Sequence, residues 1–117
     1  MKKHFTFTDY LIEREKKQRK VFKNYLKYAM EIKKIAKKEV RDPKVIVFGS
    51  ILRKNEIPQD IDILIISPDF QNHKKKGDFL VKMWKKFGSF APFEFHLITE
   101  KNYQEWYKNF IKEKIEV

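Results

Sequence analysis

The chain has 117 residues, and its 27 lysines and arginines against 16 aspartates and glutamates give a formal net charge of +11. This length is enough for one modest core, so we expect a single domain over residues 1–117. The absence of cysteine excludes disulfide and thiolate–metal chemistry and fits a cytoplasmic protein. No apolar run approaches the roughly 20 residues that span a bilayer, and we expect neither a membrane span nor a signal peptide.

The N-terminal third is expected to form one long helix, from about residue 9 to residue 41. Apolar residues recur there at three- and four-residue spacing, which indicates a helix that packs on a core, and Asp42-Pro43 ends the pattern. Between Ile12 and Val21 there is no apolar residue, so this stretch should project into solvent. An apolar cluster before it would lack a core, and we expect it to pack on a second subunit or a partner protein. Its members are Phe5, Phe7, Tyr10, Leu11 and Ile12.

Two apolar runs, residues 45–49 and 61–66, are expected to be buried strands, and the second is preceded by an acidic residue. Because side chains alternate faces along a strand, Asp60 and Asp62 should point the same way, with backbones about 6.6 Å apart. Two carboxylates so close repel unless a cation lies between them, and Mg²⁺ is the hard ion that binds carboxylates together with phosphates. The alternative is a pair of solvated aspartates at the start of a surface strand.

The turn that closes the first run is expected to hold phosphate. Gly49 lets a ligand approach the backbone with no Cβ in the way. Ser50 is a favourable N-cap for the short segment 51–53, whose first amides would attract an anion. The sequence therefore predicts a phosphate site next to the aspartate pair.

A second helix is expected over residues 72–87, ended by Gly88, and its apolar stripe comprises Phe79, Leu80, Met83, Trp84 and Phe87. The basic run 73–76 lies at its start. For this run and for the whole surface two interpretations remain. One is a solvated, heat-adapted surface rich in lysine and glutamate, as in thermophiles, and the other is a face that binds a polyanion such as RNA or a nucleoside triphosphate.

The C-terminal part is expected to contain a strand over residues 92–98 and a helix over residues 100–114 that is capped by Thr99. In the strand, Glu94 and His96 share one face, where they could simply meet solvent at the edge of a sheet. An aromatic and aliphatic stripe of the helix is expected to be core, namely Tyr103, Trp106, Tyr107, Phe110 and Ile111.

The segments FGSILR (48–53) and QDIDIL (59–64) together resemble the signature of the DNA polymerase β-type nucleotidyltransferase superfamily. They are most similar to its small stand-alone members, the minimal nucleotidyltransferases. The resemblance implies an α/β (α+β) fold in which helices flank a small mixed β-sheet. It also implies transfer of a nucleoside monophosphate, AMP from ATP, to a hydroxyl acceptor by a two-metal mechanism.

The same resemblance assigns roles to individual residues. Two Mg²⁺ ions, with Mn²⁺ as an alternative, would be held by three carboxylates, and the last of these, Glu94, would help to deprotonate the attacking hydroxyl. The carboxylates are Asp60, Asp62 and Glu94, the nucleotide-binding residues are Gly49, Ser50 and Arg53, and the site-lining residues are Lys54 and His96.

The loop after Gly49-Ser50 departs from the superfamily pattern, which continues with an arginine, a small residue, an arginine and a glycine. Here the segment 51–54 reads ILRK, so only Arg53 falls on a matching position, and Lys54 cannot reproduce a bidentate fork. The departure leaves two classes open: an enzyme, and a weak or inactive nucleotide-binding protein that neutralises a partner. Small superfamily members resemble the antitoxin half of toxin–antitoxin pairs with a HEPN-type helical toxin, which implies such a partner here. Nucleic acid is a further candidate that neither class requires.

Overall fold

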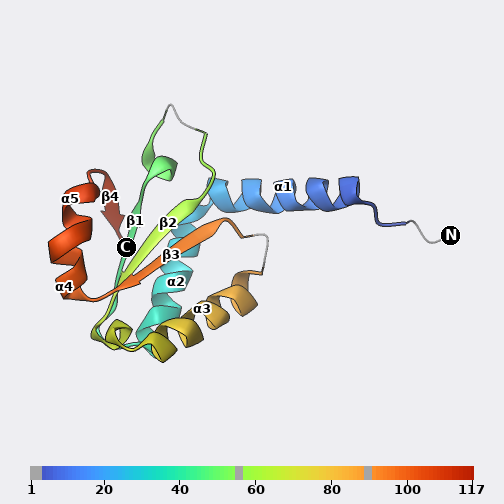
Figure 1. The fold of residues 1–117 in the computed structure, drawn as a ribbon. Coiled ribbons are helices and arrows are strands. Elements are labelled where there is room, and N and C mark those ends of the chain that lie inside the picture. The colour runs from blue at the N-terminus through green and yellow to red at the C-terminus, as the bar shows by residue number, and fades with distance from the viewer. Residues whose placement is uncertain (1–3, 55–56, 89–90) are drawn as a thin grey trace.

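The computed structural model describes residues 4–54, 57–88 and 91–117. Figure 1 shows the helices and strands and their order along the chain. Among the described residues, none of the helices is both long and apolar enough to cross a bilayer. The helices are α1 (Phe7–Lys23), α2 (Tyr25–Glu39), α3 (His73–Phe87), α4 (Glu100–Asn102) and α5 (Lys108–Phe110), with 3-10 turns η1 (Ser50–Leu52) and η2 (Pro68–Gln71) and a π-helical turn η3 (Tyr103–Tyr107); the strands are β1 (Lys44–Phe48), β2 (Ile61–Ile66), β3 (Phe93–Ile98) and β4 (Lys114–Glu116).

The strands form a four-stranded mixed sheet in the order β3-β2-β1-β4. β1 is antiparallel to both β2 and β4, whereas β2 and β3 are parallel and are joined through η2 and α3. The three strands predicted from the sequence all form, and their ends differ from the prediction by no more than one residue. The structure therefore confirms the expected α+β fold, a small mixed sheet flanked by helices.

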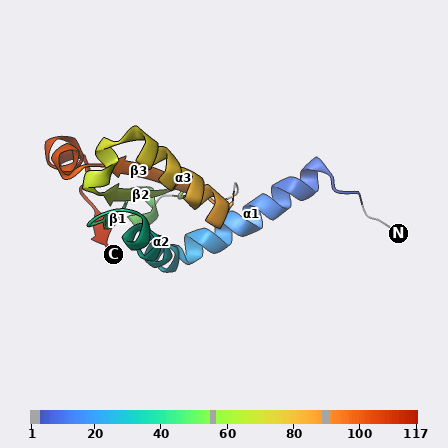
Figure 2. The same ribbon diagram turned by 90° about the horizontal axis from the view of Figure 1, so that it is seen from below.

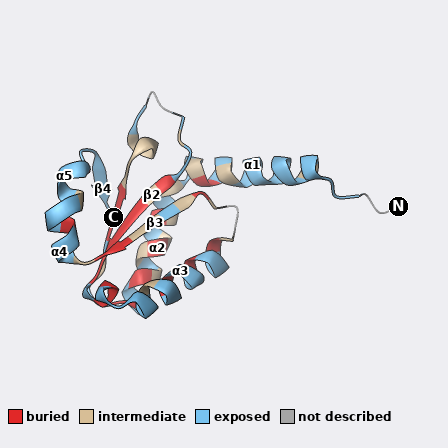
Figure 3. Cartoon of the chain, in the orientation of Figure 1, coloured by how far each residue is buried: buried red, intermediate tan, exposed pale blue. Residues whose placement is uncertain are grey.

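Each face of the sheet contributes to its own buried cluster, because side chains alternate along the strands. On one face, β-branched residues of β1 and β2 pack against α2 and α3; this cluster includes Val45, Val47, Ile61, Ile63, Ile65, Ala29, Ile32, Phe79 and Met83. On the other face the C-terminal segment covers part of the sheet, in a cluster of Ile46, Leu64, Ile66, Ile98, Tyr103 and Ile111. The buried residues coloured in Figure 3 accordingly follow the central strands and the facing sides of the helices.

The range expected as one N-terminal helix contains two helices that meet at Asn24, whose φ and ψ are −113° and 30°. The Asn24 side-chain amide donates to the carbonyl oxygen of Lys20 over 2.9 Å, a local hydrogen bond that favours ending a helix over continuing it. α2 then packs on the sheet, whereas α1 leaves the body of the molecule (Figures 1 and 2). Within α1, whose residues are all described, Val21 alone is buried, so the expected projection into solvent is confirmed.

The C-terminal segment differs from the single helix expected over residues 100–114. Thr99 caps α4 as expected, but the helical path includes the π-helical turn and ends at Phe110. The chain then turns back and adds β4 to the open edge of β1, where backbone pairing replaces helical hydrogen bonds. Trp106 and Phe110 are exposed, so their assignment to the core was wrong, whereas Tyr103 is buried.

α3 closely matches its predicted range. The Asn72 side chain accepts hydrogen bonds from the backbone of Lys74 and Lys75, and Gly88 ends the helix with a φ of 82°. Of the predicted apolar stripe, the members exposed to solvent are Leu80 and Trp84. The core contact of α3 is therefore narrower than the sequence pattern suggests.

Candidate metal and nucleotide site

The strand register places the acidic residues of β2 and β3 directly beside each other. Asp62 of β2 pairs with Glu94 of β3 in the parallel ladder, and on its other side it pairs with Phe48 of β1. His96 lies two residues beyond Glu94 and therefore on the same face of β3. Because Gly49 directly follows Phe48, the end of β1 also lies beside Asp62. Three segments that are distant in sequence thus meet at one end of β2.

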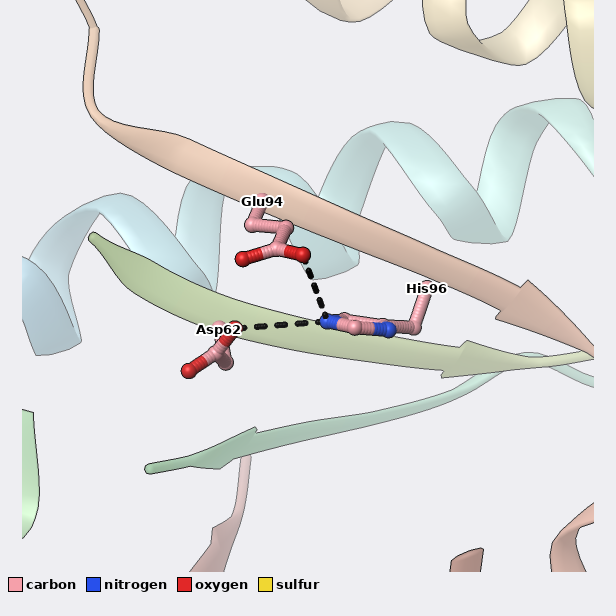
Figure 4. A group of neighbouring side chains, drawn as sticks. All are labelled: Asp62, Glu94 and His96. Carbon is pink, nitrogen blue, oxygen red and sulfur yellow. Dashed lines mark hydrogen bonds and ion pairs between the residues drawn. The ribbon is translucent and has the colours of Figure 1, made fainter. Parts of the chain in front are cut away.

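The side chains of Asp62, Glu94 and His96 converge, as Figure 4 shows. His96 Nε2 lies 3.3 Å from Asp62 Oδ1 and 3.8 Å from Glu94 Oε1. One ligand atom from each residue can be chosen so that all three lie within 4.8 Å of one another. The exposed fractions of the side chains are 20% for Asp62, 22% for His96 and 56% for Glu94, so the group is reachable from solvent but backed by the sheet.

This donor set fits a divalent cation. Two carboxylates and an imidazole are established ligand types for such ions, and a cation between the carboxylates would offset their mutual repulsion. The structure thus provides an observation in favour of metal binding that is independent of any resemblance, namely three donors from two strands gathered on one face.

Gly49 has a φ of +88°, in the region where only glycine is unstrained. A Cβ built on Gly49 would lie 2.3 Å from Asp62 Oδ2, so the carboxylate fills the space that a side chain would need. The prediction of Ser50 as an N-cap was wrong. Ser50 is the first residue of η1, the cap position belongs to Gly49, and η1 has no side-chain hydrogen bond at its N-terminus among the described residues. The backbone amide of Arg53 instead donates to the Ser50 carbonyl oxygen over 3.0 Å.

The remaining predicted residues lie around this group. Asp60 is exposed, one residue before β2, and does not belong to the convergent group of three. Arg53 and Lys54 are exposed after η1, where they line an open hollow of about 620 Å³ together with Lys112 and Lys114. The structure therefore brings together Asp62, Glu94 and His96 beside Gly49, and it places the basic side chains next to η1.

Comparison with known proteins identifies the family of this chain. The sequence model described as "Nucleotidyltransferase domain" matches residues 29–116, which is most of the chain. The chain belongs to the nucleotidyltransferase domain family. This membership agrees with the resemblance noted in the segments 48–53 and 59–64. The minimal, antitoxin-like subgroup is a finer assignment that the match does not make.

Solved structures resemble this nucleotidyltransferase domain as well. A crystal structure named "putative nucleotidyltransferase" is 35% identical, covers 80% of this chain and 98% of its own, and has a TM-score of 0.65. A second, from Sulfolobus solfataricus and of the same name, is 18% identical, covers 88% of this chain and 84% of its own, and has a TM-score of 0.51. The second likeness concerns the fold alone. No curated protein matches the chain significantly.

Two aromatic residues of the candidate site were not predicted from the sequence. The Tyr107 hydroxyl lies 3.5 Å from His96 Nδ1, and its ring meets the imidazole edge-on with centroids 5.8 Å apart. The Phe48 ring lies 5.2 Å from the imidazole. Tyr107 belongs to the π-helical turn, a feature that often occurs at functional sites, but its sequence spacing indicated only an apolar helix face.

Proposed function

We propose that this nucleotidyltransferase domain transfers AMP from ATP to a hydroxyl acceptor with the help of bound divalent metal ions. The observation that supports the proposal most directly is the opposition of Asp62 and Glu94 on paired strands, next to a glycine turn that leaves room for the Asp62 carboxylate. Family membership supports the reaction class, and the convergent donors support the metal.

In the proposed site, Asp60, Asp62 and Glu94 would hold two Mg²⁺ ions, with Asp60 reaching the site from just outside β2. When bound, the ions would stabilise negative charge on the phosphates as it develops. Gly49 and Ser50 would face the β- and γ-phosphates, and Arg53 would add a charged hydrogen-bond donor. Lys54 would contribute a point charge at the rim.

The chemical step is a displacement at the α-phosphorus. The acceptor oxygen forms a bond to this phosphorus while the bond to pyrophosphate breaks, and pyrophosphate leaves. The acceptor proton passes to the Glu94 carboxylate, which is exposed enough to return it to water. Glu94 would thus act as a base from the mouth of the site, and Asp62 would remain a metal ligand in its more enclosed position.

The competing function is a nucleotide-binding protein that neutralises a partner with little or no chemistry. It is favoured by the loop after Ser50, where Ile51 stands in place of the first arginine usual in the superfamily and packs, like Leu52, against the core. The two functions make the same prediction for nucleotide binding. They differ in whether AMP becomes attached to an acceptor.

The proposal extends to partners and location. A domain of this size has little surface to grip a large acceptor, so a second protein would supply the hydroxyl; a HEPN-type helical protein is our candidate. A second copy of the chain, bound through the N-terminal segment, is the other candidate. We propose a cytoplasmic location, consistent with the lack of cysteine.

The proposal is tested by incubating the protein with Mg²⁺, and separately with Mn²⁺, and ATP labelled at the α-phosphate, with and without the helical protein encoded by any neighbouring gene. We expect label on a protein acceptor. Binding of ATP without transfer of label would favour the neutralising partner, and the absence of both would contradict the proposed function.

The double variant Asp60→Asn with Asp62→Asn provides the site-specific control. We expect loss of Mg²⁺-dependent ATP binding by at least about tenfold, because two anionic ligands are replaced by neutral amides, while the fold is retained or stabilised by the loss of repulsion. The matched variant Asp42→Asn changes an exposed aspartate near the opposite end of β1 and should bind ATP normally. Calorimetry measures the affinities, and unchanged affinity in the double variant would show that the carboxylates are not the site.

A further inference from the structure

We propose that His96 is a direct nitrogen ligand of the metal site, and that this ligand makes the site select Mn²⁺ over Mg²⁺. The inference deepens the proposed function, since it depends on the site holding a divalent ion. It goes beyond a carboxylate-only site by assigning His96 Nε2 a bond to the metal and by naming the ion.

The first argument is geometric. Two ligand atoms that are each about 2.1 Å from a common ion lie about 3.0 Å apart at neighbouring octahedral positions and about 3.4 Å apart at tetrahedral ones. The distance of 3.3 Å between His96 Nε2 and Asp62 Oδ1 falls between these values. Glu94 Oε1 is slightly farther, at 3.8 Å, but its side chain is exposed and can close this gap by rotation. The imidazole therefore stands at a ligand position relative to Asp62, and Glu94 would join the same ion after a small movement of its side chain.

The second argument concerns the other face of the imidazole. A metal-binding histidine keeps one ring nitrogen for the ion, and a hydrogen bond from the other nitrogen fixes this tautomer. Tyr107 Oη lies 3.5 Å from His96 Nδ1 and can accept a hydrogen bond from it, because a phenolic hydroxyl both donates and accepts. Contacts with the rings of Phe48 and Tyr107 hold the imidazole in place. The surroundings of His96 thus leave Nε2 directed at Asp62 and Glu94.

The third argument is the chemistry of the ligands. Mg²⁺ is a hard ion that takes oxygen ligands, whereas the first-row transition ions also bind imidazole nitrogen, Mn²⁺ the most weakly of them. A set of two carboxylates and one imidazole therefore favours an ion that accepts both oxygen and nitrogen. Mn²⁺ meets this condition and keeps a preference for the phosphate oxygens of a nucleotide, so the same ion can serve the proposed reaction.

A purely structural His96 would instead orient Asp62 through a hydrogen bond and never touch the ion. The two roles give different spectra, because a nitrogen bonded to Mn²⁺ couples magnetically to its unpaired electrons. The test uses the full chain with Mn²⁺ and no nucleotide. Electron paramagnetic resonance measures bound Mn²⁺, electron spin echo envelope modulation detects ¹⁴N coupling, and competition with Mg²⁺ gives the ratio of the two affinities.

We expect ¹⁴N modulation from one imidazole in the wild-type protein. His96→Gln should abolish the modulation and weaken Mn²⁺ binding by about tenfold or more, while Mg²⁺ affinity changes by less than about twofold. Tyr107→Phe should keep the modulation and weaken Mn²⁺ binding to a smaller extent, as expected for a residue that positions the ligand. His73→Gln, which changes an exposed histidine at the start of α3, is the matched control and should behave as wild type.

Absence of ¹⁴N modulation from Mn²⁺ bound to the wild-type protein would overturn the inference, whatever the fold of the variants. It would also be overturned if the wild-type protein bound Mg²⁺ as tightly as Mn²⁺. Failure of this inference and of the proposed function can be told apart. Transfer of labelled AMP with no ¹⁴N coupling overturns the inference alone, whereas ¹⁴N coupling in a protein that transfers no label supports the inference and counts against the enzyme.

Discussion

The carboxylate of Asp62 lies where a side chain on Gly49 would begin. Asp62 Oδ2 would be 2.3 Å from a Cβ at this position, and the φ of +88° is itself unfavourable for any residue with a side chain. Glycine is therefore required twice over, once by the backbone turn after β1 and once by the acidic residue opposite. The turn and the carboxylate form one unit, which explains why a glycine at the end of one strand matters to an aspartate on the next.

We predict that Gly49→Ala destabilises the protein by at least about 1 kcal/mol and weakens metal binding, because the new methyl group must displace the Asp62 carboxylate. Chemical denaturation and Mn²⁺ titration measure the two effects. Gly77→Ala is the matched control: Gly77 lies within α3 with nothing within 4 Å of the new methyl, so it should stabilise the protein by about 0.5–1 kcal/mol. Normal metal affinity in Gly49→Ala would contradict the close coupling of the turn and the carboxylate.

At the scale of elements, local patterns predicted β1, β2, β3 and α3 well, because each has a strong apolar period or clear end signals. The break at Asn24 was not predicted, because the apolar spacing continues across it and the different environments of α1 and α2 arise only in the folded molecule. β4 was missed because a short exposed strand has no apolar pattern and forms by completing the edge of β1.

In the candidate site, too, some features follow from the local sequence and others arise only in the folded molecule. The position of Asp62 beside the glycine turn agrees with the prediction from spacing, whereas Asp60, predicted with it, lies outside the convergent group. The contact of Asp62 with His96 and of His96 with Tyr107 could not be predicted, because these residues meet only through the parallel pairing of β2 and β3 and the return of the C-terminal segment across the sheet.

A buried carboxylate, Asp69, connects three elements at the end of β2 that is remote from the glycine turn. Asp69, in η2, is nearly inaccessible and accepts hydrogen bonds from the Arg41 side chain at 2.8 Å, the Arg41 backbone at 3.0 Å and Lys75 at 3.1 Å. Arg41 follows α2, and Lys75 lies in the first turn of α3. These hydrogen bonds, chiefly from Arg41, lower the pKa of Asp69 from 3.8 to about 2, although burial opposes the shift.

The hydrogen bonds to Asp69 predict that the stability of the protein depends on pH. Because the pKa of Asp69 is lower in the folded state, its contribution to stability is complete above about pH 4 and is lost as the pH falls toward 2. We expect Asp69→Asn to lower the melting temperature at pH 6 and to flatten its pH dependence between pH 4 and pH 2. Thermal melts followed by circular dichroism test this. Asp78→Asn, in an exposed pair with Lys74, should leave both nearly unchanged, and a wild-type slope in Asp69→Asn would contradict the prediction.

The whole molecule is more extended than a compact domain of its length. Its radius of gyration is 15.9 Å, against about 13 Å for a compact chain of 117 residues. The excess comes from α1, which leaves the body as a nearly isolated arm (Figures 1 and 2). A capping box between Thr6 and Asp9 stabilises the start of the helix, yet Phe5 and Phe7 are 70% and 74% exposed. An ordered helix with an apolar tip and no core beneath it is typical of an interface.

We predict that the arm joins two copies of the chain, so that light scattering gives a mass above that of one chain. Deletion of residues 1–12, or Phe7→Ser with Leu11→Ser on one helix face, should weaken association by at least about tenfold, because each buried side chain of this kind contributes about 1.5–3 kcal/mol. Lys16→Ser with Lys20→Ser has the same spacing on the polar part of α1 and should leave the mass unchanged. If the wild-type chain is a monomer, or if the deletion variant contains as many chains per particle as the wild type, the arm does not serve self-association. The exposed tip must then be tested against the acceptor protein.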